Sequence, residues 1–327
     1  MNIKLKWVIA FESIIIVALI LALISSYSGN QTKEKVPENG LLSPRVYSGL
    51  LESKSFLITN FAPLRLKTQN YIGKNNLNVS VYVENLRNGA WMGINERTGF
   101  FPASLIKLPV AILITKKIEN GELSFGTMLS INDSDRTSSF GELYKTEEKQ
   151  LPVGILLEKM LKESDNTAFR VLVRQFDAED FQLILDYYNI DVNADFLNGE
   201  TNYQTLVSPK AISTLFSSLY FSTVLEPENS EYLLSLLNDS AFDIGHAASI
   251  PDGIAIAHKF GETYYVGYRY FHDCGIIYIN ESRIFYCILT KGIDREKAVE
   301  TVGIIVNEIY HYVEDTKVRL SAYKENK

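Results

Sequence analysis

Ser104 and Lys107 stand three residues apart in the apolar stretch "FFPASLIKLPVAILI", residues 100–114. On a helix this spacing places both side chains on one face, about one turn apart. A lysine amine in that position can take the proton of the serine hydroxyl and turn it into a nucleophile. The same S-x-x-K spacing recurs in the charged segment "SAYK", at Ser321 and Lys324. Spacing alone therefore identifies no site.

Two further motifs follow the first one along the chain. Ser164, Asp165 and Asn166 form "SDN" between two helical patterns, and "HKFG" carries Lys259 and Gly261 at the end of a strand pattern. Alone, the former is typical of a helix N-cap and the latter of a solvated lysine. The three motifs together, each at an edge of the expected cleft, indicate an active site. Free N–H groups at the helix start of the first motif can stabilise an oxyanion.

The elements that position these motifs are read from hydrophobic periodicity. Alternating residues on both sides of "RNGA" predict a hairpin at 78–95, and helical periods dominate an insertion at about 101–250. Three short strands and a final helix follow, at 253–260, 274–280, 283–292 and 295–313. We expect an α+β fold: an antiparallel sheet built from both chain ends, with flanking helices and an inserted all-α subdomain.

The N-terminal segment, 1–28, is typical of a protein destined for export. Lys4 and Lys6 precede an apolar stretch, Trp7–Ile24, which predicts either a membrane anchor or a cleaved signal peptide. The main domain is thus expected outside the cytoplasm, bound to the membrane by one N-terminal helix, or secreted if the segment is cleaved. The remaining boundaries are a polar linker at 29–45, the main domain at 46–318 and a charged tail at 319–327.

Composition excludes some classes of function. The net charge of −7 and the lack of Lys and Arg clusters outside the chain ends argue against nucleic-acid binding. Four histidines without metal-ligand spacing support no metal site, and we expect no cofactor and a monomer. Cys274 and Cys287 flank the turn "INES", where either a disulfide or two buried thiols are compatible with the sequence.

The order S-x-x-K, S-D-N and K-F-G resembles the signature of the penicillin-recognising serine hydrolases, in particular the class A β-lactamase family. The resemblance covers about 78–313. It implies an acyl-enzyme on Ser104, with Lys107 as base and Ser164 as proton relay. It also implies that Lys259 attracts the carboxylate of a β-lactam or of a D-Ala-D-Ala-type peptide.

The resemblance implies further substrate contacts. Asn166 would bind the side-chain amide of the substrate, and the N–H groups of Ser104 and Glu262 would form the oxyanion hole. Gly261 and Thr263 complete the expected binding surface. Thr263 is included because Phe260 stands where the family has a threonine, whose hydroxyl helps to bind the carboxylate.

A second departure concerns release of the acyl group. The family carries a glutamate in E-x-x-L-N, but here the position three before Leu197 is Ala194, and the segment is shorter. Asp195 and Glu200 are the candidate replacements, so we expect β-lactam hydrolysis with slow deacylation. The alternatives are a D,D-peptidase or cell-wall acyl transferase, and a membrane sensor that stays acylated by penicillin. His258, His272 and Asp273 suggest a His–Asp pair, for which we favour a structural role.

Overall fold

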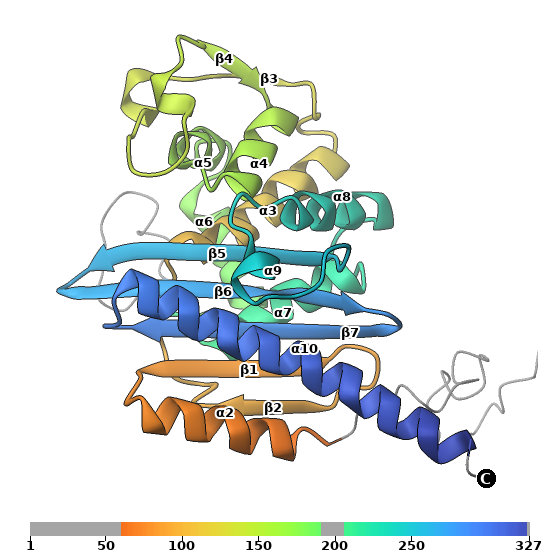
Figure 1. Ribbon diagram of the computed structural model, residues 1–327. Helices are drawn as coiled ribbons and strands as arrows, with labels where there is room; N and C mark the ends of the chain where they lie inside the picture. The colour runs from red at the N-terminus through yellow and green to blue at the C-terminus, as the bar shows by residue number, and fades with distance from the viewer. Residues whose placement is uncertain (1–59, 191–205, 326–327) are drawn as a thin grey trace, which may run out of the picture. The chain divides into compact units, whose positions relative to one another are not determined.

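The computed structural model describes residues 60–190 and 206–325, which belong to one compact unit. Its main sheet is antiparallel with the strand order β2-β1-β7-β6-β5 (Figure 1). The hairpin from the N-terminal part joins the C-terminal strands through β1 and β7, with Val81 opposite Ile288. The predicted sheet from both chain ends is therefore confirmed. The strands are β1 Val79–Asn85, β2 Trp91–Ile94, β5 Ile256–Tyr265, β6 Tyr268–Ile279 and β7 Ser282–Lys291.

Helices cover both faces of this sheet. On one face, α10 crosses the strands and packs against α2 and α9 (Figure 1). The other face packs against α7 and the rest of the helical part. The helices are α2 Ala62–Lys74, α3 Lys107–Glu119, α4 Val153–Lys162, α5 Asn166–Val173, α6 Ala178–Tyr187, α7 Pro209–Tyr220, α8 Pro227–Asn238, α9 Ile244–Ala247 and α10 Arg295–Glu325.

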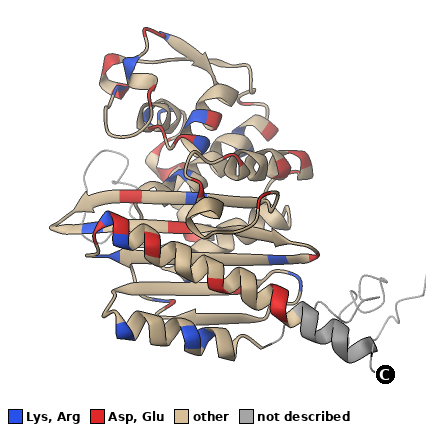
Figure 2. Cartoon of the chain, in the orientation of Figure 1, with Lys and Arg blue, Asp and Glu red and all other residues tan. Residues whose placement is uncertain are grey.

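The core is divided by the sheet, as the alternation of side chains along β7 illustrates. Tyr286 and Ile288 belong to the apolar cluster under α10, whereas Phe285 and Leu289 belong to the cluster shared with the helical part. Because side chains alternate between the two faces, a strand covered on both faces is apolar almost throughout. Figure 2 shows acidic residues along α10 and basic residues on α2, and Lys67 pairs with Glu308 between these helices at 3.5 Å.

Several elements differ from the sequence-based expectations. The β5–β6 hairpin continues through the aromatic segment up to Tyr265 and Tyr268, and α10 runs on to Glu325. Helix α2 and a small sheet of β3 (Met128–Ser130) and β4 (Gln150–Pro152) were not predicted.

The structure tests the prediction for the two cysteines but not the one for the N-terminal segment. Cys274 lies opposite Cys287 in the β6–β7 register, and a disulfide joins them, which settles the alternative left open by the sequence. The predicted anchor or signal peptide lies outside the described residues. Within residues 60–190 and 206–325, no helix combines the length and apolar character needed to cross a membrane.

Candidate active site

Ser104 lies in a short 3₁₀ helix, η3 Ala103–Ile106, that leads directly into α3 at Lys107. The predicted helix start is thus a 3₁₀ turn followed by an α-helix, and the two motif residues belong to successive segments. Ala103 before the serine has a positive φ of 48°. Ser104 is half-buried, whereas its neighbours Ala103 and Leu105 are buried. The hydroxyl-bearing residue is therefore the accessible position of this turn.

The Lys107 amine is buried beside the SDN motif. The residue is 2% exposed, and Nζ lies within hydrogen-bond distance of the carbonyl oxygen of Ser164, of Ser164 Oγ at 3.1 Å and of Asn166 Oδ1 at 2.6 Å. Burial, followed by the positive charge of Lys259, holds the pKa of Lys107 well below its ordinary value, while Asp165 acts in the opposite direction. Both causes favour the neutral amine, which can act as a base.

The SDN motif forms the turn between α4 and α5. Asp165 is the N-cap of α5 and accepts from the N–H of Ala168 at 2.8 Å, so the N-cap interpretation of the sequence holds as well. Its other oxygen accepts from the N–H of Leu143 at 2.9 Å. Ser164, fully buried, has a φ of 56°, which points its side chain towards Lys107 instead of continuing the helix. The cap therefore fixes the geometry of the relay serine.

Asn166 is held from both sides. Its Oδ1 accepts from Lys107, its Nδ2 donates to Ser139 Oγ at 2.6 Å, and its N–H donates to the carbonyl of Phe140 at 3.0 Å. Gly141 permits this approach, because a Cβ there would lie 2.0 Å from a carboxylate oxygen of Asp165. Ser139 was not predicted as a site residue, because it lies in an irregular segment with no motif of its own.

Strand β5 contributes Lys259 and Gly261 from its face towards η3. Lys259 is fully buried, and its Nζ donates to the carbonyl of Phe260 at 3.1 Å. Burial lowers the pKa of Lys259 to about 7, against a smaller opposite effect of Asp273. A Cβ on Gly261 would lie 3.1 Å from the backbone nitrogen of Ser104. The sheet edge and the nucleophile turn are therefore in direct contact.

The N–H of Glu262 points away from the sheet, at the free edge of β5. The N–H of Ile256 donates to the side chain of Asn238 on α8, so it does not bind β6. N–H directions alternate along an antiparallel strand, and Glu262 is an even number of positions further along the edge strand β5. The Glu262 carboxylate lies on the other face, in an ion pair with Arg295 at 2.9 Å. Only its backbone is available to the site, as the sequence analysis expected.

Thr263 and Phe260 occupy different faces of β5. Thr263 shares the face of Lys259 and Gly261, as strand alternation requires, and is half-buried. Phe260 is 8% exposed and packs along the free edge of the strand, with its ring centroid 6.4 Å from that of Phe140. An aromatic edge thus replaces the hydroxyl that the resemblance implies at this position.

A buried histidine ties the nucleophile turn to the sheet. His272 Nε2 lies 2.8 Å from the carbonyl oxygen of Phe101, and its Nδ1 accepts from the N–H of Thr290 at 3.2 Å. This pattern assigns the proton to Nε2, and burial lowers the pKa of His272 to about 4, so the ring is neutral near pH 7. The ring of Tyr265, in the extended part of the hairpin, stacks on Phe101 with centroids 4.1 Å apart.

The predicted His–Asp pair also exists. His258 Nδ1 lies 2.8 Å from a carboxylate oxygen of Asp273, on the face of β5 opposite Lys259. Asp195 and Glu200, the candidate deacylation bases, lie outside the described residues. In the part of the chain that the structure describes, no group of three His, Cys, Asp or Glu side chains is placed to hold a metal ion.

The site combines a serine on a helix start, a buried lysine three residues later, a serine–asparagine turn and a lysine–glycine strand edge. This combination defines the class of penicillin-recognising serine hydrolases. The profile described as "Beta-lactamase enzyme family" matches residues 63–313. The chain therefore belongs to the beta-lactamase enzyme family. The sequence-based predictions of this family, of its fold and of a serine hydrolase of the β-lactamase type are confirmed.

Individual relatives are distant. The beta-lactamase VEB-1 of Pseudomonas aeruginosa is 23% identical over 214 residues, which cover 61% of this chain and 72% of that protein. Among solved structures, the TLA-3 extended-spectrum beta-lactamase superposes with a TM-score of 0.70 at 17% identity and covers 78% of this chain and 99% of its own. PBP-A gives a TM-score of 0.68 at 20% identity, with 78% and 97% covered. These structures establish the shared fold.

Proposed function

We propose that the protein is acylated by β-lactams on Ser104 and hydrolyses them slowly. The observation that carries this proposal is the buried Lys107 amine, which follows Ser104 by three residues in the chain and contacts Ser164 and Asn166 of the SDN turn. A free lysine, with a pKa of about 10.4, would be protonated and useless as a base. The lowered pKa of Lys107 favours a neutral amine about one helical turn after the nucleophile in the chain.

From these positions, acylation proceeds through three proton transfers. Lys107 Nζ takes the proton of the Ser104 hydroxyl while Oγ bonds to the carbonyl carbon of the lactam ring. The carbonyl oxygen becomes an oxyanion, bound by the N–H groups of Ser104 and Glu262. As the ring C–N bond breaks, the nitrogen receives a proton from Ser164 Oγ, which Lys107 replenishes across the 3.1 Å hydrogen bond. The ester on Ser104 is the acyl-enzyme.

Substrate binding uses the remaining motif residues. Protonated Lys259 attracts the carboxylate of the substrate, and Thr263 lies on the same face of β5. Asn166 Nδ2 donates one of its two hydrogens to Ser139 Oγ, and the second hydrogen is the donor for the side-chain amide of the substrate. Phe260 offers no hydroxyl to the carboxylate, so we expect weaker ground-state binding than a K-T-G strand provides.

Slow release is proposed because the position expected to hold the deacylating glutamate is Ala194. Hydrolysis of the ester then depends on Asp195, Glu200 or unassisted water. The test is turnover of a chromogenic cephalosporin by the purified protein, with Asp195→Ala and Glu200→Ala as variants. We expect slow turnover that at least one variant reduces further. Rapid turnover that both variants leave intact would show that this explanation of the segment is wrong.

The second candidate is a D,D-peptidase or a related cell-wall acyl transferase, and the observation that favours it is the same Ala194. Transfer of the acyl group to an amine needs no glutamate to activate water. Release of terminal D-alanine from a peptidoglycan stem peptide, abolished by Ser104→Ala, would support this activity. A penicillin adduct that persists for hours without D-alanine release would instead support the sensor alternative.

We further propose that the protein acts outside the cytoplasm, tethered by its N-terminal segment. The apolar stretch Trp7–Ile24 behind Lys4 and Lys6 supports a membrane tether, and the disulfide between Cys274 and Cys287 fits an oxidising compartment. Fractionation of expressing cells with protease added from outside tests this proposal. We expect the protein in the membrane fraction and accessible to the protease. Recovery in the cytoplasmic fraction would contradict it.

A further inference from the structure

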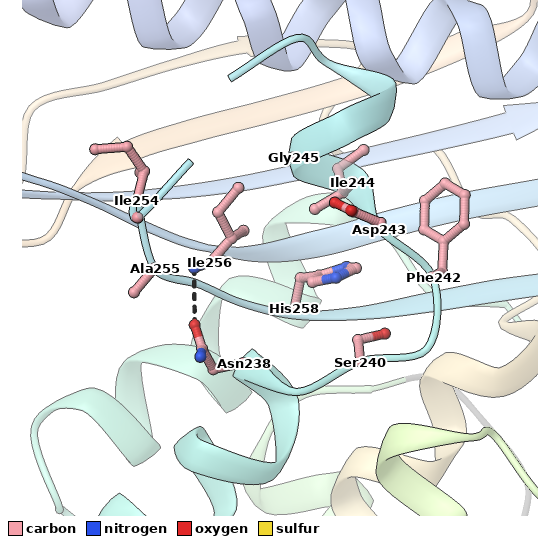
Figure 3. A pocket seen from close by; sticks show the side chains of 11 residues that line it. Asn238, Ser240, Phe242, Asp243, Ile244, Gly245, Ile254, Ala255, Ile256 and His258 are labelled. Carbon is pink, nitrogen blue, oxygen red and sulfur yellow. Dashed lines mark hydrogen bonds between the residues drawn. The ribbon is translucent and has the colours of Figure 1, made fainter. Parts of the chain in front are cut away.

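A cavity of about 430 Å³ lies on the face of β5 that is turned away from Ser104 (Figure 3). Its walls come from the end of α8, the segment leading into α9, and the first residues of β5. The volume is in the range of sites for small organic ligands. The acylation chemistry of Ser104 does not use this space. The cavity is therefore considered as a separate ligand site.

The ring of His258 points into the cavity and presents an acceptor to it. Asp273 is fully buried, accepts a hydrogen bond from the Tyr286 hydroxyl and lies 2.8 Å from His258 Nδ1. A carboxylate only accepts, so Nδ1 carries the hydrogen, and in the neutral form of the ring Nε2 is then the nitrogen with the lone pair. Among the described residues, Nε2 has no hydrogen-bond partner. Figure 3 shows the ring between Asp243 and Ser240.

Other polar groups on the wall add to this acceptor character. Asp243 accepts from the N–H of His246 at 2.8 Å, which leaves further lone pairs on its carboxylate. The hydroxyl oxygen of Ser240 is buried without a partner among the described residues. Of the described residues that line the cavity, Asp243 is the one carboxylate, and none is lysine or arginine. The local charge therefore favours a cation over an anion.

Apolar side chains form the rest of the wall. Phe242 packs at the mouth with its ring centroid 6.2 Å from that of His258, and Ile244, Ile254 and Ile256 complete the lining. An aromatic face next to a carboxylate suits a positively charged nitrogen carried on an apolar body, since the ring quadrupole and the charge both attract it. A fully hydrated inorganic cation would leave these apolar walls without a partner.

We propose that this cavity binds a small organic amine, whose protonated nitrogen is held by Asp243, His258 and Ser240 and whose apolar body packs on Phe242. The site goes beyond the proposed acylation at Ser104 and does not depend on it. Its occupant shares β5 with the active site, because His258 and Lys259 are consecutive residues that point to opposite faces. This class of ligand is inferred from the hydrogen-bond acceptors on His258 and Ser240, from the Asp243 carboxylate and from the apolar walls.

The test is titration with benzylamine, benzyl alcohol and benzoate, which share one apolar body and differ in charge. Binding is followed by backbone amide chemical shifts in two-dimensional NMR. We expect benzylamine to perturb the amides of α9 and the start of β5, with an affinity at least about five times that of benzyl alcohol, and benzoate to bind least. Binding should persist in Ser104→Ala, which separates this site from the active site.

Single substitutions test whether the Asp243 carboxylate is the group that binds the amine. Asp243→Asn retains a residue that caps α9 and should lower the benzylamine affinity at least about fivefold. The exposed neighbour Asp252, which does not line the cavity, provides the matched control Asp252→Asn with no loss of affinity. Ile254→Trp should fill the cavity and abolish binding. The proposal would be overturned if the three probes bound with equal affinity or if benzylamine did not bind. It would also be overturned if the Asp243→Asn protein bound benzylamine like the native one.

Discussion

Gly261 of β5 lies against the backbone nitrogen of Ser104: a Cβ at position 261 would come within 3.1 Å of it, and within 3.3 Å of the Ala103 Cβ. A side chain at position 261 would fit only if the strand edge or the nucleophile turn moved by a few tenths of an ångström. The two N–H groups of the proposed oxyanion hole belong to Ser104 and to the residue after Gly261. Their separation therefore depends on this contact.

Replacement of Gly261 by alanine should slow acylation without unfolding the protein. The added methyl must push the turn by a few tenths of an ångström, and displacement of reacting groups on this scale costs about 10- to 100-fold in rate. The second-order rate constant for labelling by a fluorescent penicillin measures the effect. Gly73→Ala is the control, because that helical glycine has open space around its Cβ position. Equal labelling rates in both variants would contradict the proposed oxyanion hole.

The acylation rate should decline at alkaline pH because Lys259 loses its proton. Burial lowers the pKa of Lys259 to about 7, so the charge that attracts the substrate carboxylate is present below that pH and lost above it. A profile of kcat/KM against pH reports the free enzyme and should show an alkaline limb near pH 7. Lys259→Arg keeps its charge and should shift this limb upward. An unchanged limb in Lys259→Arg would contradict the assignment.

His272 should make the folded state sensitive to acid. Its pKa is lowered from 6.5 to about 4 by burial, so between these values the unfolded chain binds a proton that the folded protein does not. The stabilisation is complete above pH 6.5 and is lost progressively as the pH falls towards 4, by about 3 kcal/mol in total. Urea unfolding at a series of pH values measures it.

The variant His272→Phe separates this titration from the other groups. Phenylalanine cannot titrate or bind the Phe101 carbonyl, so the acid-dependent loss of unfolding free energy should shrink by about 3 kcal/mol relative to the native protein. Acylation by penicillin should also slow, since the segment before Ser104 loses the 2.8 Å hydrogen bond to the sheet. An identical pH dependence in both proteins would rule out His272 as its source.

Phe260→Thr should improve substrate binding at the expense of stability. The new hydroxyl would lie at the free edge of β5, where the Phe260 ring now approaches Phe140, and from there we expect it to bind the substrate carboxylate and lower KM about tenfold. Loss of the ring, whose centroid lies 5.5 Å from that of Phe242, should reduce the free energy of unfolding by about 3 kcal/mol. Phe260→Leu removes the ring without adding a hydroxyl. A similar fall of KM in both variants would show that space, and not the hydroxyl, limits binding.

The motifs were predictable from the sequence because each is a short local pattern. Ser104 with Lys107, the capped turn at Asp165 and the strand edge at Gly261 are each encoded within a few residues, and the hairpin and sheet follow from periodicity. Helix α2 was missed because its buried positions are sparse: Leu64, Thr68 and Ile72 are the buried residues of a largely polar segment.

Contacts between distant segments could not be predicted. His272 reaches Phe101 across 171 positions, and Ser139 reaches Asn166 only because Gly141 allows the intervening segment to approach Asp165. The amine cavity depends on the placement of α9 against β5. Such pairings are set by tertiary packing, which a single sequence does not display. Asp195 and Glu200 fall outside the described residues, so their predicted role stays a prediction.

Mapping of the penicillin adduct tests the central claim most directly. The native protein, Ser104→Ala and Ser321→Ala are incubated with penicillin, and intact mass and peptide mass spectra are followed over hours. The two variants remove the serines of the two S-x-x-K matches in the chain. We predict one adduct on the peptide that contains Ser104, unchanged in Ser321→Ala, absent in Ser104→Ala and slow to disappear. An adduct that survives in Ser104→Ala, or that maps to another residue, would contradict the account.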